Sequence, residues 1–311
     1  MSDAVPVAND SAPAHPAGAE IGLAHAAMLL FALIISTSFP LGAAIASELD
    51  PVVLTLLRFV LATALFGGLV TARGGWYRPG LRQAGGYLWI GSLLALYFIS
   101  MFEALRWTSA VNTSALFTLV PVVAAVVAYF LLGQRISRLQ RVCLGLGAAG
   151  ALVVLFGEDL AQLSAFRLGH GELVFIVGCV AYGTYIPFVR KAHGREPLVS
   201  FTFWCLAAST LILALASLPR LGGVDWTGLP SHIYLGIAYL AVFPTAITFY
   251  LSKYAGLRLP SGPLMGYTYL VPGFVVVEEL ILGGPWPGPY VIGGVLLTAI
   301  VTVILQIGGR R

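Results

Sequence analysis

The sequence contains few charged residues for its length. Asp, Glu, Lys and Arg make up 10% of the 311 residues, whereas hydrophobic residues make up 59%. A soluble domain usually has roughly 25% charged residues, so this chain has too little polar surface to cover a water-soluble fold. The net charge of +4 does not indicate a nucleic-acid partner, because the basic residues form short clusters between apolar runs. The lipid bilayer is therefore the expected solvent for most of the chain.

Residues that could bind metals or phosphates are also scarce. The three cysteines lie inside apolar runs, and the five histidines lie in the N-terminal stretch or near the ends of the runs. Neither set has the spacing of metal ligands. The sequence has no glycine-rich phosphate loop with its lysine, which excludes ATP-driven transport by this chain alone. We therefore expect no cofactor, no metal and no enzymatic activity, and we expect buried thiols at Cys143, Cys179 and Cys205.

Long apolar runs dominate what is present. A helix needs roughly 20 apolar residues to cross the hydrocarbon core of a bilayer. Residues 1–21 contain no Lys or Arg, so they lack the basic start of a signal peptide and are expected to form a disordered tail. The runs predict ten membrane spans, near residues 22–46, 52–72, 82–107, 110–132, 138–157, 169–192, 197–218, 231–256, 262–282 and 288–308.

The distribution of the 17 Lys and Arg residues supports this number of spans. With ten spans, both termini lie on one side of the membrane, and most basic residues lie on that side. Only Arg106, Arg167 and Arg220 fall on the opposite side, and only Arg58 lies within a span. The positive-inside rule then places both termini in the cytoplasm of a bacterial-type inner membrane.

The two halves of the chain resemble each other. Pro40 in the first span matches Pro187 in the sixth, and each is soon followed by an acidic residue and a proline. The sequence Leu-Val-Pro ending at Pro121 recurs in the ninth span at Pro272. The fifth and tenth spans carry glycine pairs, at Gly145 and Gly147 and at Gly293 and Gly294.

Each half contains five spans, an odd number, so the second half must enter the membrane from the opposite side. The predicted fold is an all-α integral membrane protein with two inverted five-helix repeats around a central cavity, an arrangement that suits alternating access. The repeats are residues 22–157 and 169–308, joined by a linker at 158–168. Pro121 and Pro272 remove backbone hydrogen bonds near the middle of their spans. With Pro40 and Pro187 they are candidate gating residues, although packing kinks explain them equally well.

Ionisable residues within the predicted spans lie toward the outer ends. Arg58 is about two turns from the outer end of the second span, and three glutamates lie near the outer ends of the third and ninth spans. An ionisable group at membrane depth is normally paired. We therefore expect a structural ion pair or network of Arg58 with one of these acids, the alternative being a substrate site. The acids are Glu103, Glu278 and Glu279.

The polar groups in the middle of the membrane are neutral and are the candidate substrate-binding residues. In the eighth span, Tyr239, Phe243, Tyr250 and Tyr254 form one stripe, and Tyr250 is the candidate for cavity lining, although such a stripe also suits helix packing or an interfacial belt. Hydroxyls and aromatic faces suit a partly apolar solute with hydrogen-bonding groups, such as an amino acid. The other candidates are Ser36, Ser38, Tyr97, Met101, Asn112, Thr118, Tyr182, Tyr185, Tyr267 and Tyr269.

Several motifs resemble the EamA-domain permeases of the drug/metabolite transporter superfamily. They are the Arg58-Phe59 pair, the segment Ala104-Leu-Arg-Trp-Thr-Ser-Ala110 followed by Pro121 and Leu131-Leu-Gly133, and a second copy at Tyr254-Ala-Gly-Leu-Arg258 followed by Pro272. The resemblance covers residues 22–308. It implies ten spans, two inverted repeats, a cavity lined by spans one, three, four, six, eight and nine, and efflux of amino acids or other metabolites. The aromatic content resembles the aromatic amino-acid exporter branch. Gln134 replaces the glutamate that often closes span four, and the small multidrug relatives' first-helix glutamate has no counterpart, which argues against proton-coupled cation efflux.

Three functional hypotheses remain. The leading one is a monomeric exporter or facilitator of amino acids and related metabolites, in which two five-helix halves rock around a neutral cavity. Downhill movement is favoured over antiport because no proton or sodium site is evident. The second is an organic-phosphate or nucleotide-sugar antiporter, which would need buried Lys or Arg. The third is a membrane enzyme acting on lipid-linked substrates, with Glu103, Arg106, Glu278 and Glu279 as its outer cluster.

Overall fold

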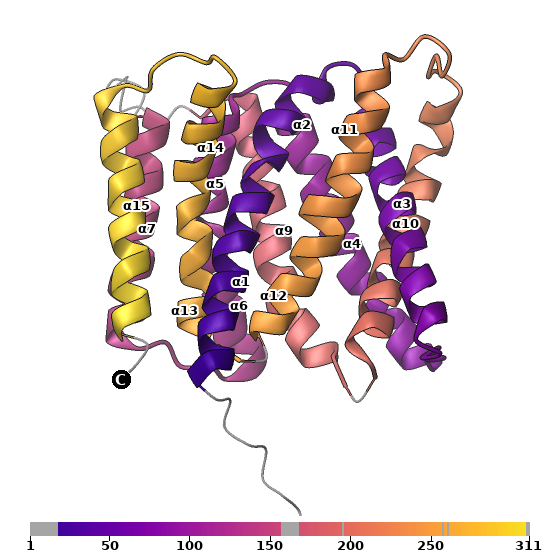
Figure 1. The fold of residues 1–311 in the computed structure, drawn as a ribbon, viewed down its shortest axis with the longest axis horizontal. Helices are drawn as coiled ribbons and strands as arrows, with labels where there is room; N and C mark the ends of the chain where they lie inside the picture. Colours follow the sequence, from indigo (N-terminus) through magenta and orange to yellow (C-terminus); the bar gives the residue numbers. More distant parts are fainter. Residues whose placement is uncertain (1–17, 157–167, 195, 257, 260, 309–311) are drawn as a thin grey trace, which may run out of the picture.

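The computed structural model describes residues 18–156, 168–194, 196–256, 258–259 and 261–308. All regular structure in these residues is helical (Figure 1). The predicted linker and N-terminal tail lie largely outside the described residues. The elements are α1 (Gly18–Ser36), α2 (Ser38–Ala46), α3 (Pro51–Ala72), α4 (Leu81–Ala104), α5 (Ala110–Phe117), α6 (Val120–Leu132), α7 (Arg138–Phe156), α9 (His170–Ala192), α10 (Leu198–Leu221), α11 (Ser231–Ala241), the π-helix η1 (Val242–Ile247), α12 (Thr248–Gly256), α13 (Ser261–Gly266), the 3-10 helix η2 (Tyr267–Leu270), α14 (Val271–Ile281) and α15 (Pro289–Gly308).

The described residues contain ten helical segments long and apolar enough to cross a membrane, which confirms the predicted number of spans. Their bounds agree with the predicted ones to within a few residues. Four of the ten are built from more than one helix: span one from α1 and α2, span four from α5 and α6, span eight from α11, η1 and α12, and span nine from α13, η2 and α14. The remaining spans are single helices.

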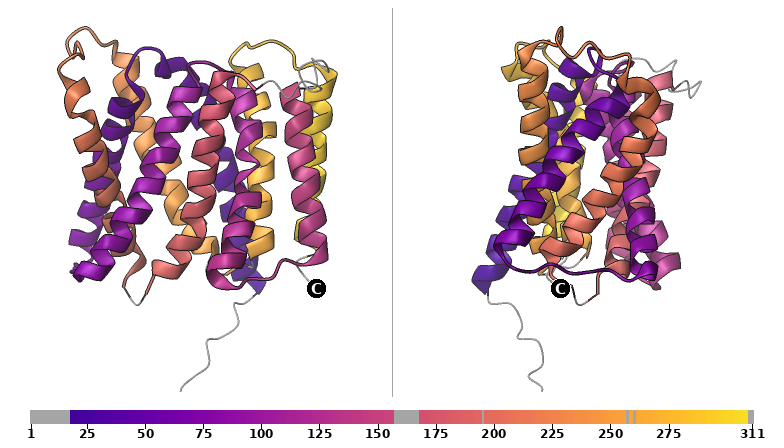
Figure 2. Two further views of the ribbon diagram at one scale, coloured as in Figure 1. Left: turned by 180° about the vertical axis from the view of Figure 1, so that it is seen from behind. Right: turned by 90° about the vertical axis from the view of Figure 1, so that its right-hand side faces the viewer.

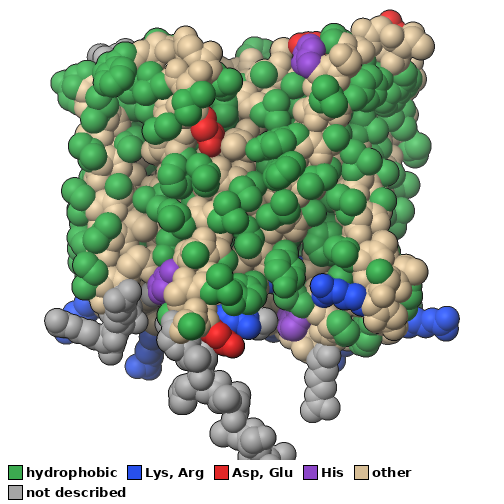
Figure 3. Space-filling view, viewed as in Figure 1, with side chains coloured by type: hydrophobic (Ala, Val, Ile, Leu, Met, Phe, Trp, Pro, Cys, Tyr) green, Lys and Arg blue, Asp and Glu red, His purple; other side chains and the backbone are tan. Residues whose placement is uncertain are grey.

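The two repeats enter the membrane from opposite ends of the molecule. Helix α1 begins and α15 ends at the lower end of the molecule in Figure 1, whereas α9 begins at the upper end. The inverted repeat predicted from the odd number of spans is therefore present. Lys and Arg side chains gather along the lower end on the face shown in Figure 3. We call this end, which contains the start of α1 and the end of α15, the basic end, and the other the far end.

The two repeats interleave instead of standing apart. Helix α1 packs with α12 and α14 of the second repeat, and α9 packs with α4 and α6 of the first (Figures 1 and 2). Two layers result, each containing the first span of one repeat and the third and fourth spans of the other. The two repeats are therefore not separate halves of the molecule, because contacts between the repeats hold each layer together.

The second and fifth spans close the two edges of the molecule, and each packs against its counterpart. At one edge, α3 contacts α10, and the hydroxyl oxygens of Thr63 and Thr210 lie 2.8 Å apart. These two threonines are 147 positions apart in the sequence, the same separation as Pro40 and Pro187. At the other edge, α7 contacts α15 where Gly150 faces Gly294. A Cβ atom on Gly294 would lie 2.7 Å from the Gly150 carbonyl oxygen, so only glycine allows this approach. The predicted glycine pairs contribute unequally, since Gly145 and Gly293 have open space beside them.

Helix breaks occur in spans one, four and nine. Pro121 is the second residue of α6, and Pro272 is the second residue of α14. Both lie just after a break, where a missing N–H costs no helical hydrogen bond. Pro40 lies in the first turn of α2, after the break at Thr37. Pro187 lies inside the continuous helix α9. The bends predicted in spans four and nine are confirmed, whereas span six remains one helix.

A hydroxyl group compensates the backbone at each break. Thr37 donates to the Ile34 carbonyl, Thr118 to that of Ala115 and Thr268 to that of Met265, each over 2.7 Å. A carbonyl without a partner is costly where water is scarce. Each threonine therefore adds a hydrogen bond to a backbone carbonyl at a break within the membrane, and in span four the Ala115 carbonyl also accepts the Thr118 backbone N–H over 3.0 Å.

Candidate functional site

A cavity of about 320 Å³ lies between the two layers and reaches the basic end. Its wall includes residues from the end of α9, the α9–α10 connection and the end of α12, all of which lie at the basic end (Figure 1). Spans one, six, seven, eight and nine supply the lining. Spans three and four do not, contrary to the set that the family resemblance implied. The lining residues are Met28, Phe31, Tyr182, Tyr185, Ile186, Val189, Arg190, His193, Leu198, Phe201, Phe249, Ser252, Lys253, Gly256, Leu264, Met265 and Thr268.

Two helices present one regular face each to this cavity. On α12, Phe249, Ser252, Lys253 and Gly256 follow at intervals of three, one and three residues, which places them on one side of a helix. On α9, the residues from Tyr182 to Val189 follow the same pattern. The side chains on these faces are mainly aromatic and aliphatic, with polar groups at the mouth.

The polar groups at the mouth are mostly basic. Arg190, His193 and Lys253 all line the cavity, and no Asp or Glu is among the lining residues described. The Lys253 ammonium donates a hydrogen bond to the Thr202 hydroxyl and lies 5.1 Å from the centre of the Phe201 ring. No ion pair of Lys253 occurs among the residues that the structure describes. The expected neutral cavity is therefore wrong at its mouth, where the wall is cationic.

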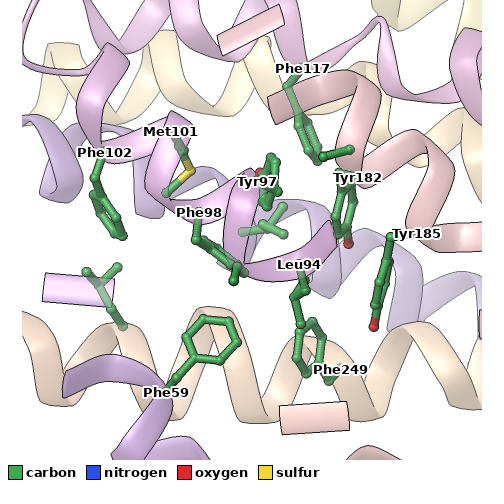
Figure 4. Close-up of a cluster of buried hydrophobic side chains, with 14 of the residues drawn as sticks. Phe59, Leu94, Tyr97, Phe98, Met101, Phe102, Phe117, Tyr182, Tyr185 and Phe249 are labelled. Carbon is green, nitrogen blue, oxygen red and sulfur yellow. The ribbon is translucent and has the colours of Figure 1, made fainter. Parts of the chain in front are cut away.

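Aromatic rings close the cavity toward the far end. The rings of Tyr185 and Tyr182 stack with centres 5.5 Å apart, and Tyr182 stacks on Tyr97 at 4.5 Å (Figure 4). Phe117 lies beside Tyr182 at 5.9 Å and contacts Phe39 at 5.8 Å. Phe39, Tyr97 and Phe117 are buried. The structure is therefore open at the basic end and closed above the tyrosine stack.

A polar contact joins the two repeats beyond this stack. The Ser36 hydroxyl lies 2.5 Å from a carboxylate oxygen of Glu278 and 2.7 Å from the Leu33 carbonyl. Ser36 ends α1, and Glu278 lies on α14. Ser38, which begins α2, is buried with no hydrogen-bond partner for its hydroxyl among the described residues. These groups lie on the closed side of the cavity.

Arg58 is fully buried, and it forms no ion pair with any residue that the structure describes. Its Nε donates to the Thr245 hydroxyl over 2.7 Å, and its guanidinium lies 4.2 Å from the centre of the Phe98 ring. Among the described residues, its two terminal nitrogens have no hydrogen-bond partner. The expected pairing of Arg58 with an acid is wrong for the described residues, because Arg58 instead contacts Thr245 of η1 and the Phe98 and Phe102 rings of α4. Cation–π contacts take the place of a counter-ion.

The three acids have other surroundings. Glu103 lies at the exposed end of α4, where it binds Arg106 at 3.2 Å and the Trp107 indole at 2.9 Å. Glu278 contacts Ser36 as described above. Glu279 forms no ion pair among the residues that the structure describes.

The predicted substrate-binding residues divide into several groups. Tyr182 and Tyr185 line the cavity, and Tyr97 and Met101 lie buried just beyond it (Figure 4). Tyr269 lines the smaller cavity described below, and the other remaining residues do not line the cavity between the layers. Asn112 reaches Thr108 near the far end, Thr118 supports the break in span four, Tyr267 bonds His25 at 2.9 Å, and Tyr269 packs on Gly147.

Tyr250 does not line the cavity between the layers but borders a separate one of about 370 Å³, together with Tyr254 and Arg258. Its side chain is 50% exposed on the outer surface, and Phe243 of the same stripe is exposed as well. The neighbouring residue Phe249, 100° away around the helix, faces the cavity instead. The predicted stripe is not one regular face, because the π-helix η1 interrupts the α-helix between Tyr239 and Tyr250, and the Tyr239 hydroxyl bonds Thr37 of α1 over 3.1 Å.

A second, smaller cavity of about 220 Å³ adjoins the first and shares Ile186, Arg190 and Met265 with it. Pro121 and Pro187, from opposite repeats, both line this cavity. Two of the four predicted prolines therefore border this cavity, whereas Pro40 and Pro272 line neither cavity.

Sequence reasoning missed the basic mouth of the cavity. Lys253 was counted among the residues outside the membrane, although it precedes the end of its helix by three residues. Phe249, Ser252, Lys253 and Gly256 share one helical face, and this spacing was the available signal. Phe201 carried no such signal, since its helix is apolar on all sides.

Inverted repeats, helices interrupted at membrane depth and a cavity open at one end define a membrane transporter. The sequence pattern of the EamA-like transporter family matches twice, at residues 22–156 and 169–306. The chain belongs to this family.

Similar proteins carry names of the same kind. The "Uncharacterized transporter YyaM" of Bacillus subtilis (strain 168) is 23% identical, over 87% of this chain and 89% of that protein. YcxC of the same organism, also an "Uncharacterized transporter", is 24% identical, over 82% and 86%. An "Uncharacterized transporter" of Archaeoglobus fulgidus is 24% identical, over 81% and 86%. A solved structure described as "Crystal structure of protein" superimposes with a TM-score of 0.72 at 21% identity, over 93% of this chain and 98% of that one, which supports the fold alone.

Proposed function

We propose that this chain exports amino acids with apolar or aromatic side chains, and related small metabolites, by alternating access through the central cavity. The observation that supports this proposal is a cavity of about 320 Å³ that is open at one end and closed by stacked tyrosines at the other. Small-molecule sites have volumes of roughly 300–1,000 Å³. The cavity therefore suits a solute of amino-acid size, and its aromatic wall suits an apolar body.

The charge distribution supports an orientation. Basic residues gather at the end where α1 begins (Figure 3), and the positive-inside rule assigns such an end to the cytoplasm. In this orientation the protein lies in the inner membrane, and its cavity faces the cytoplasmic solutes that an exporter must load. The second state would open at the far end after the tyrosine stack separates.

Transport is proposed to be downhill and to need only one copy of the chain. No Asp or Glu lines the described cavity, so its wall supplies no carboxylate to exchange a proton for the substrate. The family and the names of the relatives indicate a transporter in place of the lipid-processing enzyme considered from the sequence.

A second candidate is an organic-phosphate or nucleotide-sugar antiporter. It is favoured by the basic side chains of Arg190, His193 and Lys253 on the cavity wall, because phosphates require such groups. Competition by sugar nucleotides and organic phosphates against amino-acid uptake distinguishes the two candidates.

The test uses the purified full chain in proteoliposomes and a panel of radiolabelled amino acids. We expect uptake down a concentration gradient with no pH gradient, strongest for aromatic and large apolar amino acids. Gly256→Phe should place a ring in the cavity mouth and abolish uptake. Gly145→Phe is the matched control, because Gly145 lies on α7 with open space beside it and does not line the cavity. No uptake of any amino acid would contradict the proposal, and uptake only under an imposed proton gradient would contradict its downhill form.

A further inference from the structure

The cavity wall is unbalanced in charge. Its described lining contains Arg190, His193 and Lys253 but no carboxylate. A solute with a negative group would meet favourable partners at this wall. A solute with an ammonium group would meet no carboxylate among the described lining residues, and it would lie beside Arg190 and Lys253, which repel it.

Lys253 is the cation best placed to bind a solute. It is partly buried, with Phe201 and Phe249 around its ammonium group, and its hydrogen-bond partner is the neutral hydroxyl of Thr202. An ammonium group has three donors. No carboxylate pairs with it among the residues that the structure describes. A partly desolvated cation of this kind gains most from an anion that enters the cavity, because charge-assisted hydrogen bonds are strong where water is scarce.

The aromatic wall lies next to this cation. Phe201 and Phe249 line the cavity beside Lys253, and Tyr182 and Tyr185 continue the wall toward the closed end. An anion held at Lys253 would therefore place a ring or an aliphatic chain against these side chains. The site has a charged head position and an apolar body position in one continuous cavity.

We propose that the site binds organic anions, namely carboxylates with an aromatic or apolar body, with Lys253 as the anchor of the carboxylate. This inference rests on the proposed transport function and, among the related metabolites named there, favours carboxylates over the amino acids themselves. Deaminated relatives of the amino acids, such as 2-oxo acids, are preferred to the zwitterionic amino acids, because the wall provides no acidic partner for an ammonium group. Arg190 and His193 line the same wall, so a phosphate is the alternative ligand that the experiment distinguishes from a carboxylate.

The experiment compares four probes that share a phenyl ring: phenylpyruvate, L-phenylalanine, phenethylamine and phenyl phosphate. Binding to the purified full chain is measured by calorimetry, and transport by counterflow in proteoliposomes. Lys253→Met removes the charge but keeps the chain length, and Lys253→Arg keeps the charge. Lys191→Met is the matched control. Lys191 lies in the last turn of α9 at the basic end of the molecule, is exposed and does not line the cavity.

The expected order of affinity is phenylpyruvate first, L-phenylalanine second and phenethylamine last. Loss of one charge-assisted hydrogen bond should weaken phenylpyruvate binding about tenfold or more in Lys253→Met. Lys253→Arg should retain most of the affinity, and Lys191→Met should behave as the unaltered protein. The melting temperature of each variant without ligand shows whether it is folded.

Other results overturn the inference in distinguishable ways. If L-phenylalanine binds at least as well as phenylpyruvate, or if Lys253→Met binds phenylpyruvate normally, the inference fails while the proposed function stands. If phenyl phosphate binds most tightly, the anchored group is a phosphoryl group and the carboxylate assignment fails. If none of the probes binds or moves, the proposed function fails together with the inference.

Discussion

Arg58 and Lys253 are two cations held in similar ways at opposite ends of the molecule. Each lies between the second and third spans of its own repeat, bonds to a threonine hydroxyl and contacts two aromatic rings. Their surroundings differ, however. Arg58 is fully buried in the closed half, whereas Lys253 borders the cavity in the open half. The same local chemistry therefore stabilises packing in one half and offers a partner to a solute in the other.

The largest expected difference between the two halves is their accessibility. In a background without Cys143, Cys179 and Cys205, which are buried, Ser252→Cys should react with a membrane-impermeant maleimide added at the basic end. Ser38→Cys, buried beyond the tyrosine stack, should stay unlabelled from either side. Thr227→Cys in the exposed α10–α11 loop is the control for reagent at the far end. Rapid labelling of Ser38→Cys would show that the far half is not closed.

Replacing each cation by alanine tests the difference in their roles. Arg58→Ala should lower the free energy of unfolding by about 2–5 kcal/mol, because it leaves a cavity among packed rings. Lys253→Ala should lower it by less than about 1 kcal/mol, since Lys253 already borders open space. Unfolding in detergent by heat or denaturant measures both. Arg58→Met, which fills most of the volume, should recover much of the loss.

The outcome for transport completes this test. If Arg58→Ala abolished transport while its stability stayed unchanged, Arg58 would be part of the substrate route and the contrast with Lys253 would be lost.

Removing the Ser36 hydroxyl should weaken the closure of the far half. Ser36→Ala deletes a hydrogen bond to the Glu278 carboxylate, worth about 1.5–3 kcal/mol, so the population open at the far end should rise about tenfold or more. The measurement is the labelling rate of Ser38→Cys in this background. Ser92→Ala is the matched control, because Ser92 donates only to the carbonyl three residues earlier. Equal labelling rates in the two variants would exclude the Ser36–Glu278 contact as a latch.

The smallest expected effect lies at the edge between α3 and α10. A double-mutant cycle with Thr63→Val and Thr210→Val should give a coupling energy of about 0.6 kcal/mol, the average for such bonds in membranes. Thr71→Val, on the exposed end of α3, controls for the general cost of the substitution. A coupling energy near zero would mean that the two hydroxyls do not bond to each other in the membrane.

The spans and their inverted order could be predicted because they depend on one-dimensional properties. Hydropathy locates a helix that faces lipid, and the placement of Lys and Arg determines its direction. The breaks at Pro121 and Pro272 were also accessible, because proline lacks the N–H that a helix interior needs. The interleaving of the repeats could not be predicted from the sequence, because it depends on which helices pack against each other in the folded protein.

The site was harder to predict than the fold. The residues Tyr182 and Tyr185 were found because a tyrosine in a long apolar helix stands out. Lys253 and Phe249 were not predicted because hydropathy alone does not distinguish a face toward lipid from a face toward a cavity, and the prediction chose Tyr250, 100° from Phe249 around α12. Arg58 was assigned an acidic partner because charge pairing is the usual solution, whereas the structure surrounds it with rings.

The pairing of α3 with α10 and of α7 with α15 has a consequence for the transport cycle. These pairs join each helix to its own counterpart, as Thr63 and Thr210 show. If the two repeats exchange conformations during a cycle, each other contact between them is replaced by its counterpart from the opposite repeat. The contacts of α3 with α10 and of α7 with α15 stay the same, because each helix there already faces its own counterpart. These two helix pairs are therefore expected to keep their geometry at the two edges of the molecule while the layers between them tilt. A substitution in one of these pairs should change the stability of the protein without changing the ratio of its two conformations, open at the basic end or at the far end.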